Sequence, residues 1–160
     1  MLIIRPISKA DNAPIAQMIR AVFDEYGAVT DGTVYTDPTT DNLSKVFEQK
    51  NAVLYVADFN GEIHGCCGIF PTTGLPKSHT ELVKFYVSKQ FRGTGLGRQL
   101  FEKCEKKAIE YSYSHLYLES TPDFNQAVGI YKKIGFVSLP KPLGNSGHYG
   151  CTIWMKKEIG

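Results

Sequence analysis

The segment Phe91-Arg92-Gly93-Thr94-Gly95-Leu96-Gly97-Arg98 separates two patterns of apolar residues. Residues 82–87 have apolar side chains at both odd and even positions, which is typical of a central strand covered on both faces. Residues 95–109 gather their apolar side chains on one helical face. Closely spaced glycines allow a sharp turn and a close approach of the backbone, and the free N–H groups at a helix start attract phosphate. Arg92 and Arg98 add charged donors, so the segment predicts an anion-binding turn.

Three other interpretations of this turn can be compared with its sequence. A dinucleotide-binding fingerprint, GxGxxG, requires glycine where Arg98 stands and a long parallel βαβ series around it. A P-loop requires Gly-Lys followed by Ser or Thr, and the segment has no such sequence. The glycines can also shape a plain strand-to-helix turn without a ligand, and the sequence leaves that alternative open.

Upstream of the turn, the clearest local pattern is a β-hairpin. Residues 53–57 and 63–70 read as strands, and they flank Asn60-Gly61, a dipeptide that tolerates the positive φ of a tight turn. The chain begins with a short strand at Ile3 and Ile4.

A helix is predicted between that first strand and the hairpin. Its apolar residues recur at helical spacing, and Asp11 or Asn12 is the predicted N-cap. Residues 24–40 then read as a long loop, a kind of segment that often carries function, and residues 43–47 as a second short helix.

Downstream of the turn, the patterns predict a strand at 116–118, a helix at 125–134 and closing strands at 136–137 and 151–155. The whole chain of 160 residues suits one domain, 1–160, of class α/β: helices packed around a mixed sheet.

Composition limits the classes of function. A formal charge of +2 with scattered basic residues does not favour a nucleic-acid-binding protein. No stretch approaches about 20 apolar residues and the N-terminus lacks a signal pattern, so we expect a cytoplasmic protein without a membrane partner. The four cysteines form no CxxC pair and predict neither a metal site nor a redox motif. Cys66 and Cys67, adjacent on a strand, should point to opposite faces.

The turn also reads as Arg-x-x-Gly-x-Gly, residues 92–97, which resembles the coenzyme A pyrophosphate motif of the GNAT superfamily of N-acetyltransferases. The resemblance continues in Asn125-x-Ala127, Tyr131 and Gly135-Phe136, and in the order of elements over nearly the whole chain. It implies a mostly antiparallel mixed sheet of six to seven strands with about four helices on both faces. It also implies acetyl-CoA as cosubstrate, no metal, and a monomer or homodimer. The coenzyme-binding residues carried over are Phe85, Tyr86, Val87, Arg92, Gly93, Thr94, Gly95, Leu96, Gly97, Arg98 and Asn125. Asn125 is alternatively a plain helix N-cap.

A narrower resemblance concerns the acceptor. Four segments look similar to a bacterial GNAT group associated with amino-acid N-acetylation: Arg5-Pro6-Ile7, Tyr35-Thr36-Asp37-Pro38, Glu81-x-x-Lys84 and Gly147-His148-x-x-Cys151. It implies transfer of acetyl to the primary amine of a small molecule, with L-amino acids among the acceptors. Fold-level likeness does not fix the amine.

The reaction needs an acid and a base. An amine attacks a thioester only with a free lone pair, and the departing thiolate needs a proton. The resemblance places Tyr131 near the coenzyme sulfur as general acid, and the alternative is a core tyrosine on an apolar helix face. Glu81 is the leading base and Glu119 its rival, and for each the alternative is an exposed strand-end carboxylate.

The acceptor pocket has weaker candidates. A substrate carboxylate requires a cation, for which Lys84 and His148 are the candidates, unless they are an ordinary sheet-end lysine and a loop histidine. Tyr26, Tyr35 and Asp37 are expected to line the amine pocket from the early loop.

Three rival functions stay open. Covalent transfer through a cysteine has His148 and Cys151 as its only nearby pair. A non-catalytic acyl-CoA-binding module would use the same coenzyme site. Acetylation of protein or peptide amines would need an open acceptor cleft, which the sequence does not reveal.

Overall fold

One seven-stranded sheet organises the protein, and the computed structural model describes all of residues 1–160. The strand order is β1-β2-β3-β4-β5-β7-β6, and every neighbouring pair is antiparallel except β4 and β5. The strands are β1 Leu2–Pro6, β2 Val53–Phe59, β3 Glu62–Phe70, β4 His79–Val87, β5 His115–Ser120, β6 Val137–Leu139 and β7 Ile153–Glu158. None of the helices is long and apolar enough to cross a membrane.

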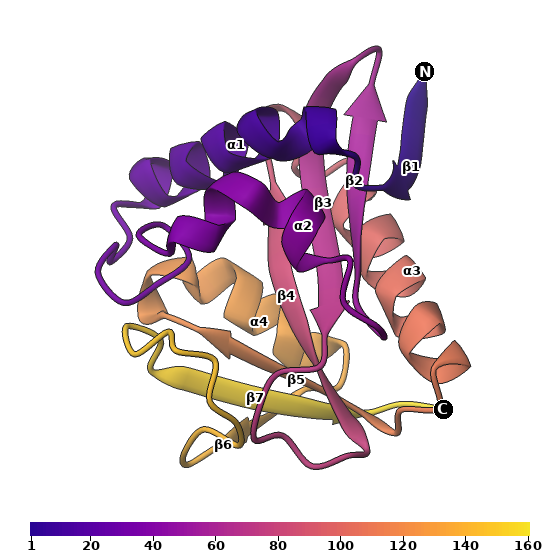
Figure 1. Cartoon of the computed structure of the whole chain (residues 1–160). Helices are drawn as coiled ribbons and strands as arrows, with labels where there is room; N and C mark the ends of the chain where they lie inside the picture. The colour runs from indigo at the N-terminus through magenta and orange to yellow at the C-terminus, as the bar shows by residue number, and fades with distance from the viewer.

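Four helices cover the two faces of the sheet (Figure 1). The helices α1 Asn12–Tyr26 and α2 Leu43–Val46 pack on one face, and α3 Leu96–Glu110 and α4 Asn125–Lys133 pack on the other. Each face therefore has its own buried apolar cluster. The α/β class, the mixed sheet and the helices on both faces agree with the prediction from the sequence.

Adjacent cysteines show how the sheet separates the two cores. The side chain of Cys66 is buried in the cluster under α1 and α2, and that of Cys67 in the cluster under α3 and α4. This alternation confirms the prediction that the two thiols face opposite sides.

Local signals predicted several elements correctly. The hairpin joins β2 to β3 through Asn60 and Gly61, whose φ angles are 52° and 92°. The predicted central strand is β4, which has a strand on either side, and the predicted amphipathic helix is α3. The last strand differs from the prediction, because β7 begins at Ile153 and not at Cys151.

The predicted cap of α1 is wrong in its mechanism. Asp11 precedes α1 but makes no capping hydrogen bond, because its carboxylate accepts from Arg5 at 2.8 Å and from the Ser8 amide at 2.7 Å. The Asn12 side chain accepts from the Ser44 amide at 2.8 Å, near the start of α2. These polar groups tie early segments together and leave α1 without a side-chain cap.

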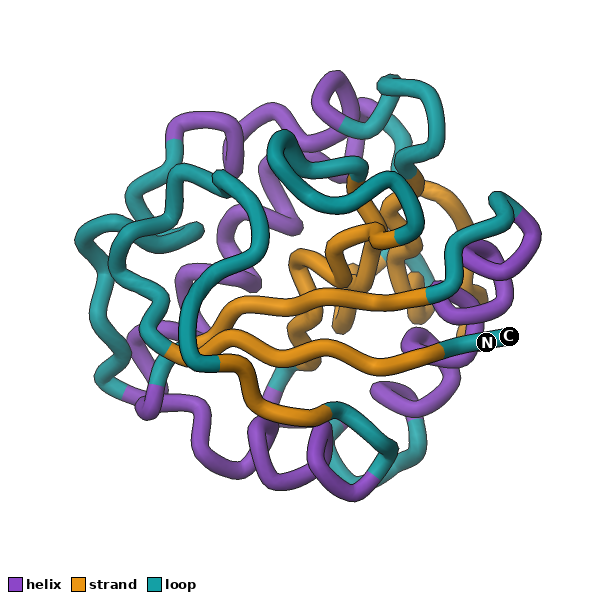
Figure 2. Tube along the Cα trace, turned by 90° about the horizontal axis from the view of Figure 1, so that it is seen from below, coloured by secondary structure: helices purple, strands orange, loops and turns teal.

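The sheet opens between β4 and β5. Their parallel pairing extends over His79–Glu81 and His115–Tyr117 only, after which β4 pairs with β3 alone and β5 with β7 alone. In Figure 1, β2, β3 and β4 run upright whereas β5 and β7 lie across them. Figure 2, seen from below, shows the same twist, with some strands crossing the view and others foreshortened behind them.

A β-bulge in β4 reinforces the opening. The pairing with β3 passes from Val83–Gly68 to Tyr86–Cys66, so two residues of β4 oppose one residue of β3. Within the bulge Lys84 adopts a φ of 54°, a left-handed conformation that is rare for a residue with a side chain. Strained positions of this kind concentrate at functional sites.

Candidate functional site

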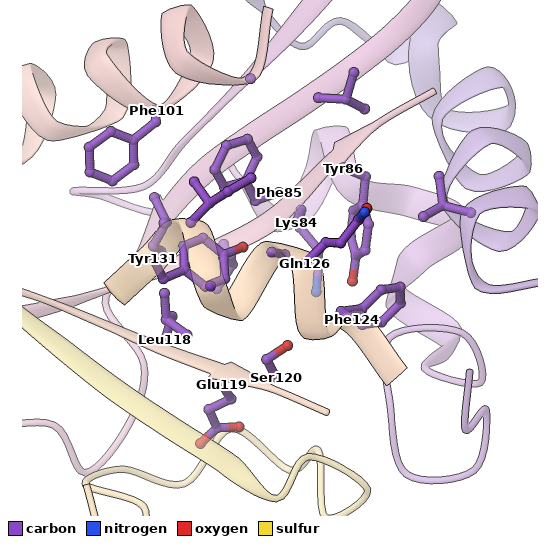
Figure 3. A pocket seen from close by; sticks show the side chains of 18 of the residues that line it. Lys84, Phe85, Tyr86, Phe101, Leu118, Glu119, Ser120, Phe124, Gln126 and Tyr131 are labelled. Atoms are coloured by element: carbon purple, nitrogen blue, oxygen red, sulfur yellow. The ribbon is translucent and has the colours of Figure 1, made fainter. Parts of the chain in front are cut away.

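A cleft of about 1160 Å³ occupies the gap where β4 and β5 part. Its walls come from β4, the end of β5, the glycine turn, the first turns of α3, helix α4, the end of α1 and two loops. Figure 3 shows side chains of the cleft from several of these elements, including Lys84 and Phe85 of β4, Glu119 of β5 and Tyr131 of α4.

The glycine turn presents an uninterrupted row of free amides. The backbone N–H groups of residues 93–98 donate no hydrogen bond within the protein. Gly93 and Gly95 have φ angles of 77° and 88°, and a methyl group at either position would meet no neighbouring atom. Glycine is therefore needed there for backbone conformation. Free amides followed by a helix N-terminus form an anion site suited to a pyrophosphate.

Arg92 lines the cleft, and it also makes contacts within the protein that its predicted role as a phosphate donor does not include. Its guanidinium is paired with both carboxylate oxygens of Glu25 at the end of α1, and its Nε donates to the Val87 carbonyl at 3.1 Å. The same guanidinium lies 5.0 Å from the centre of the Tyr26 ring. Pairing with Glu25 raises the pKa of Arg92 further. Arg92 thus connects α1 with the end of β4, whereas Arg98 is 80% exposed and pairs with Glu102.

Tyr131 lies both in the core and on the cleft. Its side chain is buried in the cluster under α3 and α4, and its ring packs against Phe85 and Phe136. The ring also lines the cleft, and its hydroxyl forms no hydrogen bond within the protein. Burial raises the pKa of this phenol, so it stays protonated at neutral pH.

Asn125, the first residue of α4, also lines the cleft. The N-cap of α4 is Phe124, so the interpretation of Asn125 as a plain N-cap is wrong. Its side chain makes no hydrogen bond within the protein, and it can therefore serve a ligand.

The other side of the gap, on the face of α1 and α2, contains charged residues among its aromatic ones. Glu81 is only 4% exposed and accepts a hydrogen bond of 2.5 Å from Thr72. Burial, helped by the negative charge of Glu119, raises the pKa of Glu81 to about 7. The alternative of an exposed strand-end carboxylate is therefore wrong for Glu81. A carboxyl group with this pKa is suited to accept a proton near neutral pH.

Lys84 and Glu119 complete the charged residues on this side of the cleft. Lys84 stands on the bulge and not at the end of the sheet, and burial lowers its pKa. Glu119 accepts hydrogen bonds from Tyr117 at 2.7 Å and from Ser146 at 2.5 Å. Both residues line the cleft with Glu81, so the two candidate bases and a candidate cation are brought together.

Asp37 and His148 are joined across the chain. The Nε2 atom of His148 lies 2.7 Å from a carboxylate oxygen of Asp37. Burial opposes ionisation of Asp37, but hydrogen bonds from His148 and Thr39 outweigh it and lower its pKa to about 2. His148 lines the cleft, so it is not merely a histidine in a free loop.

Tyr26 and Tyr35, both predicted to line the amine pocket, lie in different places. Tyr26 lines the cleft, and its ring packs against Phe124. Tyr35 does not line the cleft: its ring packs on Phe23, and its carbonyl accepts from Arg20. The prediction that Tyr35 faces the amine pocket is therefore not supported by its position.

The proposed cysteine nucleophile lacks an activating partner. The His148 ring is paired with Asp37, and only the Cys151 amide contacts His148, through its carbonyl. Burial, with the negative charges of Glu119 and Glu81, raises the pKa of Cys151 to about 12, so the thiol is neutral. No group of three metal-binding side chains occurs in the protein.

Sequence patterns missed three partners of the site: Glu25, Thr72 and Ser146. Each pairs with a site residue through the tertiary fold. A lone glutamate on a helix or a lone hydroxyl in a loop has no local signal that distinguishes it from its neighbours.

Comparison with known proteins agrees with the geometry. Residues 16–136 match the model of the acetyltransferase (GNAT) family. A protein of Escherichia coli K12, YjgM, described as an uncharacterized N-acetyltransferase, is 34% identical over 158 residues, covering 98% of this chain and 95% of YjgM. A GNAT-family acetyltransferase of Staphylococcus aureus Mu50 superposes with a TM-score of 0.86 at 17% identity over all of both chains. The PaiA N-acetyltransferase of Thermoplasma acidophilum, whose structure contains coenzyme A, superposes with a TM-score of 0.77 at 16% identity over 99% of both chains. The chain belongs to the GNAT family and is an N-acetyltransferase.

Proposed function

We propose that the protein transfers the acetyl group of acetyl-CoA directly to the primary amine of a small molecule that also carries a carboxylate, such as an L-amino acid. One observation carries this proposal. The gap between β4 and β5 joins two chemically different faces, with free amides and Tyr131 on one side and Glu81, Lys84 and Glu119 on the other. Cosubstrate and acceptor can thus approach from opposite faces and meet in the gap.

The coenzyme side has residues suited to the pyrophosphate, the pantetheine arm and the acetyl group of acetyl-CoA. The amides of residues 93–98 suit the pyrophosphate, and the β4 backbone over 85–87, without a β5 partner, suits the pantetheine arm. Asn125 offers an unpaired side-chain amide at the opposite wall. The N–H of Val87 is our candidate donor to the acetyl carbonyl.

The proton balance follows from the two pKa shifts. The acceptor nitrogen attacks the thioester carbon, so that a C–N bond forms and the C–S bond breaks. Glu81, with a pKa of about 7, receives the proton from the amine. Tyr131, protonated because burial raises its pKa, gives a proton to the leaving thiolate. The raised pKa of Cys151 gives no support to a covalent acetyl-cysteine.

The acceptor side supports a zwitterionic amine. The carboxylates of Glu81 and Glu119 attract an ammonium group, and Lys84 and His148 are the cleft residues suited to a carboxylate. Tyr26 adds an aromatic wall, and Asp37 holds His148 in place.

The experiment is release of free coenzyme A from acetyl-CoA with a panel of amino acids, amino-acid amides, polyamines, aminoglycosides and peptides. We expect release with amino acids and weaker activity with their amides, which lack the carboxylate. Lys84→Met should raise KM for the amino acid far more than for its amide, whereas the same change at the exposed Lys50 should alter neither. Binding of acetyl-CoA without release for any amine would instead indicate a non-catalytic acyl-CoA-binding module.

A further inference from the structure

Two loops meet over the acceptor side of the cleft. The first, residues 27–37 between α1 and the turn before α2, is called the clamp loop here. The second, residues 140–152 between β6 and β7, is called the cover loop. The clamp loop follows α1, which packs on the β1–β4 half of the sheet, and the cover loop belongs to the β5–β7 half. Strand pairing joins these halves only over His79–Glu81 and His115–Tyr117.

The clamp loop bonds to the other half at three points along its length. The Val29 amide donates to the Asp123 carboxylate at 3.0 Å, just after β5. The Gly32 carbonyl accepts from the Gly150 amide at 2.7 Å. Asp37 pairs with His148 at 2.7 Å. The loop is therefore fastened across the opening of the sheet at its start, middle and end.

The middle contact is backbone against backbone and leaves no room for a side chain. A Cβ atom on Gly150 would overlap the Asp31 carbonyl and lie 2.8 Å from the Thr33 methyl carbon. A Cβ atom on Gly32 would lie 2.5 Å from the Tyr149 ring and 2.7 Å from the Gly150 nitrogen. Separations this short force the neighbouring atoms to move. The loops can thus meet only while both positions are glycine.

The contact lies at the edge of the cleft. Thr33 and Val34 line the cleft directly after Gly32, and His148 and Cys151 line it on either side of Gly150. The cover loop is also tied to β5, because Ser146 donates to Glu119 at 2.5 Å. A peptide acceptor would need space for its chain to leave the cleft between these loops, whereas a free amino acid ends at its carboxylate.

We propose that Gly32 and Gly150 are specificity-determining residues. Their contact closes the acceptor side against amines whose chain continues past one residue, the N-termini of peptides above all. This inference rests on the proposed transfer to small amines, and it assigns the size limit of that transfer to one contact between two glycines.

The test compares a free amino acid from the panel with its dipeptide carrying a C-terminal glycine. For wild-type protein we expect kcat/KM to favour the free amino acid. Gly150→Ala should raise the ratio of dipeptide to amino-acid kcat/KM about tenfold, the scale on which one methyl group alters selectivity. Gly32→Ala should act in the same direction. Gly61→Ala is the matched control for Gly32→Ala: both glycines have positive φ, but a methyl group at Gly61 meets nothing. It should leave the ratio unchanged.

Amide hydrogen exchange provides a readout that does not depend on activity. The Gly150 amide donates to Gly32 of the clamp loop, and the Val29 amide of the clamp loop donates to Asp123 after β5. Both amides should therefore be protected in wild-type protein and exchange faster in Gly150→Ala. Exchange that is equal in Gly150→Ala and wild type, or a folded variant with an unchanged selectivity ratio, overturns the inference. If none of the amines tested causes wild-type protein to release coenzyme A, the proposed function is contradicted instead. The exchange result still decides whether the contact between the clamp loop and the cover loop exists.

Discussion

Tyr131 combines two roles that make its mutation informative. The ring packs against Phe85 and Phe136, and the hydroxyl borders the cleft without a partner in the protein. Tyr131→Phe keeps the packing and removes the proton donor. We expect kcat to fall about a hundredfold, as is usual for loss of a general acid. Coenzyme A affinity, measured by calorimetry, should stay near the wild-type value. A folded variant with wild-type turnover contradicts the assignment.

Glu81 should determine the acidic limb of the pH profile. Its carboxylate accepts a proton only when ionised, and burial raises its pKa to about 7. We therefore expect kcat/KM to rise with pH through about 7 in wild-type protein. In Glu81→Gln this limb should disappear, leaving only the ionisation of the acceptor amine. The measurement is kcat/KM from pH 5.5 to 9 for both proteins, and an identical limb in both excludes Glu81 as the base.

The same carboxyl group should influence stability. Its pKa is higher in the folded protein than the ordinary value of 4.5, so its protonated form contributes stability below about pH 4.5, and that contribution is lost as pH rises through about 7. A shift of this size corresponds to at most about 3 kcal/mol. Glu81→Gln should therefore gain free energy of unfolding relative to wild type between pH 5 and pH 8. Urea denaturation at both pH values tests this, and a constant difference between the proteins contradicts it.

Residues could be predicted from the sequence where a motif or a local conformation demands them. Gly93 and Gly95 are required by the turn, and both have positive φ. Thr72 and Glu25 had no such signal, because their partners, Glu81 and Arg92, lie in other elements. The burial that raises the pKa of Glu81 is likewise a property of the folded sheet.

At the scale of elements, Arg92 connects helix α1 to the end of β4 and the start of the glycine turn. We infer that it positions the turn through Glu25. Both side chains are about 30% exposed, so the pair should be worth no more than about 1 kcal/mol, or about fivefold in coenzyme A affinity. Arg92→Glu and Glu25→Arg should each weaken affinity by this order.

The double charge reversal separates the two roles of Arg92. If Arg92 positions the turn, the Arg92→Glu, Glu25→Arg protein should recover most of the lost affinity, because the pair is restored. If Arg92 contacts phosphate directly, the double variant should stay as weak as Arg92→Glu. Calorimetric titration of coenzyme A into the four proteins distinguishes these outcomes.

Helices and strands that depend on a local sequence signal could be predicted. The irregularities within them, such as a β-bulge, could not. The hairpin follows from Asn60-Gly61, and the covered strand β4 from apolar residues at both odd and even positions. Nothing near Lys84 in the sequence indicates a left-handed residue inside β4, because the bulge arises from pairing with β3. The end of pairing between β4 and β5, which creates the cleft, is likewise a tertiary feature.

In the whole molecule, the sheet consists of two halves, β1–β4 and β5–β7, which are joined only by the short pairing of β4 with β5. The faces and their cores could be predicted from periodicity, as the opposed positions of Cys66 and Cys67 illustrate. The closure of the acceptor side could not, because it depends on pairs such as Asp37 with His148, which are 111 positions apart in the chain. Long-range contacts between loops follow from the fold and not from local pattern.

A ligand that contacts both halves should stabilise the whole molecule. Coenzyme A placed along the cleft would touch the glycine turn next to β4 and the start of α4 next to β5. At a concentration of 100 times its Kd, coenzyme A should add about 2.7 kcal/mol to the free energy of unfolding, which raises Tm by about 5–10 °C for a protein of this size.

Gly95→Ala strains the backbone of the glycine turn, where φ is 88°, and should lose most of this shift at the same ligand concentration. Gly61→Ala carries comparable backbone strain at φ 92°, at a residue that does not line the cleft, and should keep the full shift. Equal shifts in both variants would place the coenzyme phosphates elsewhere, and no shift or heat of binding with wild-type protein would remove the coenzyme site from this cleft altogether.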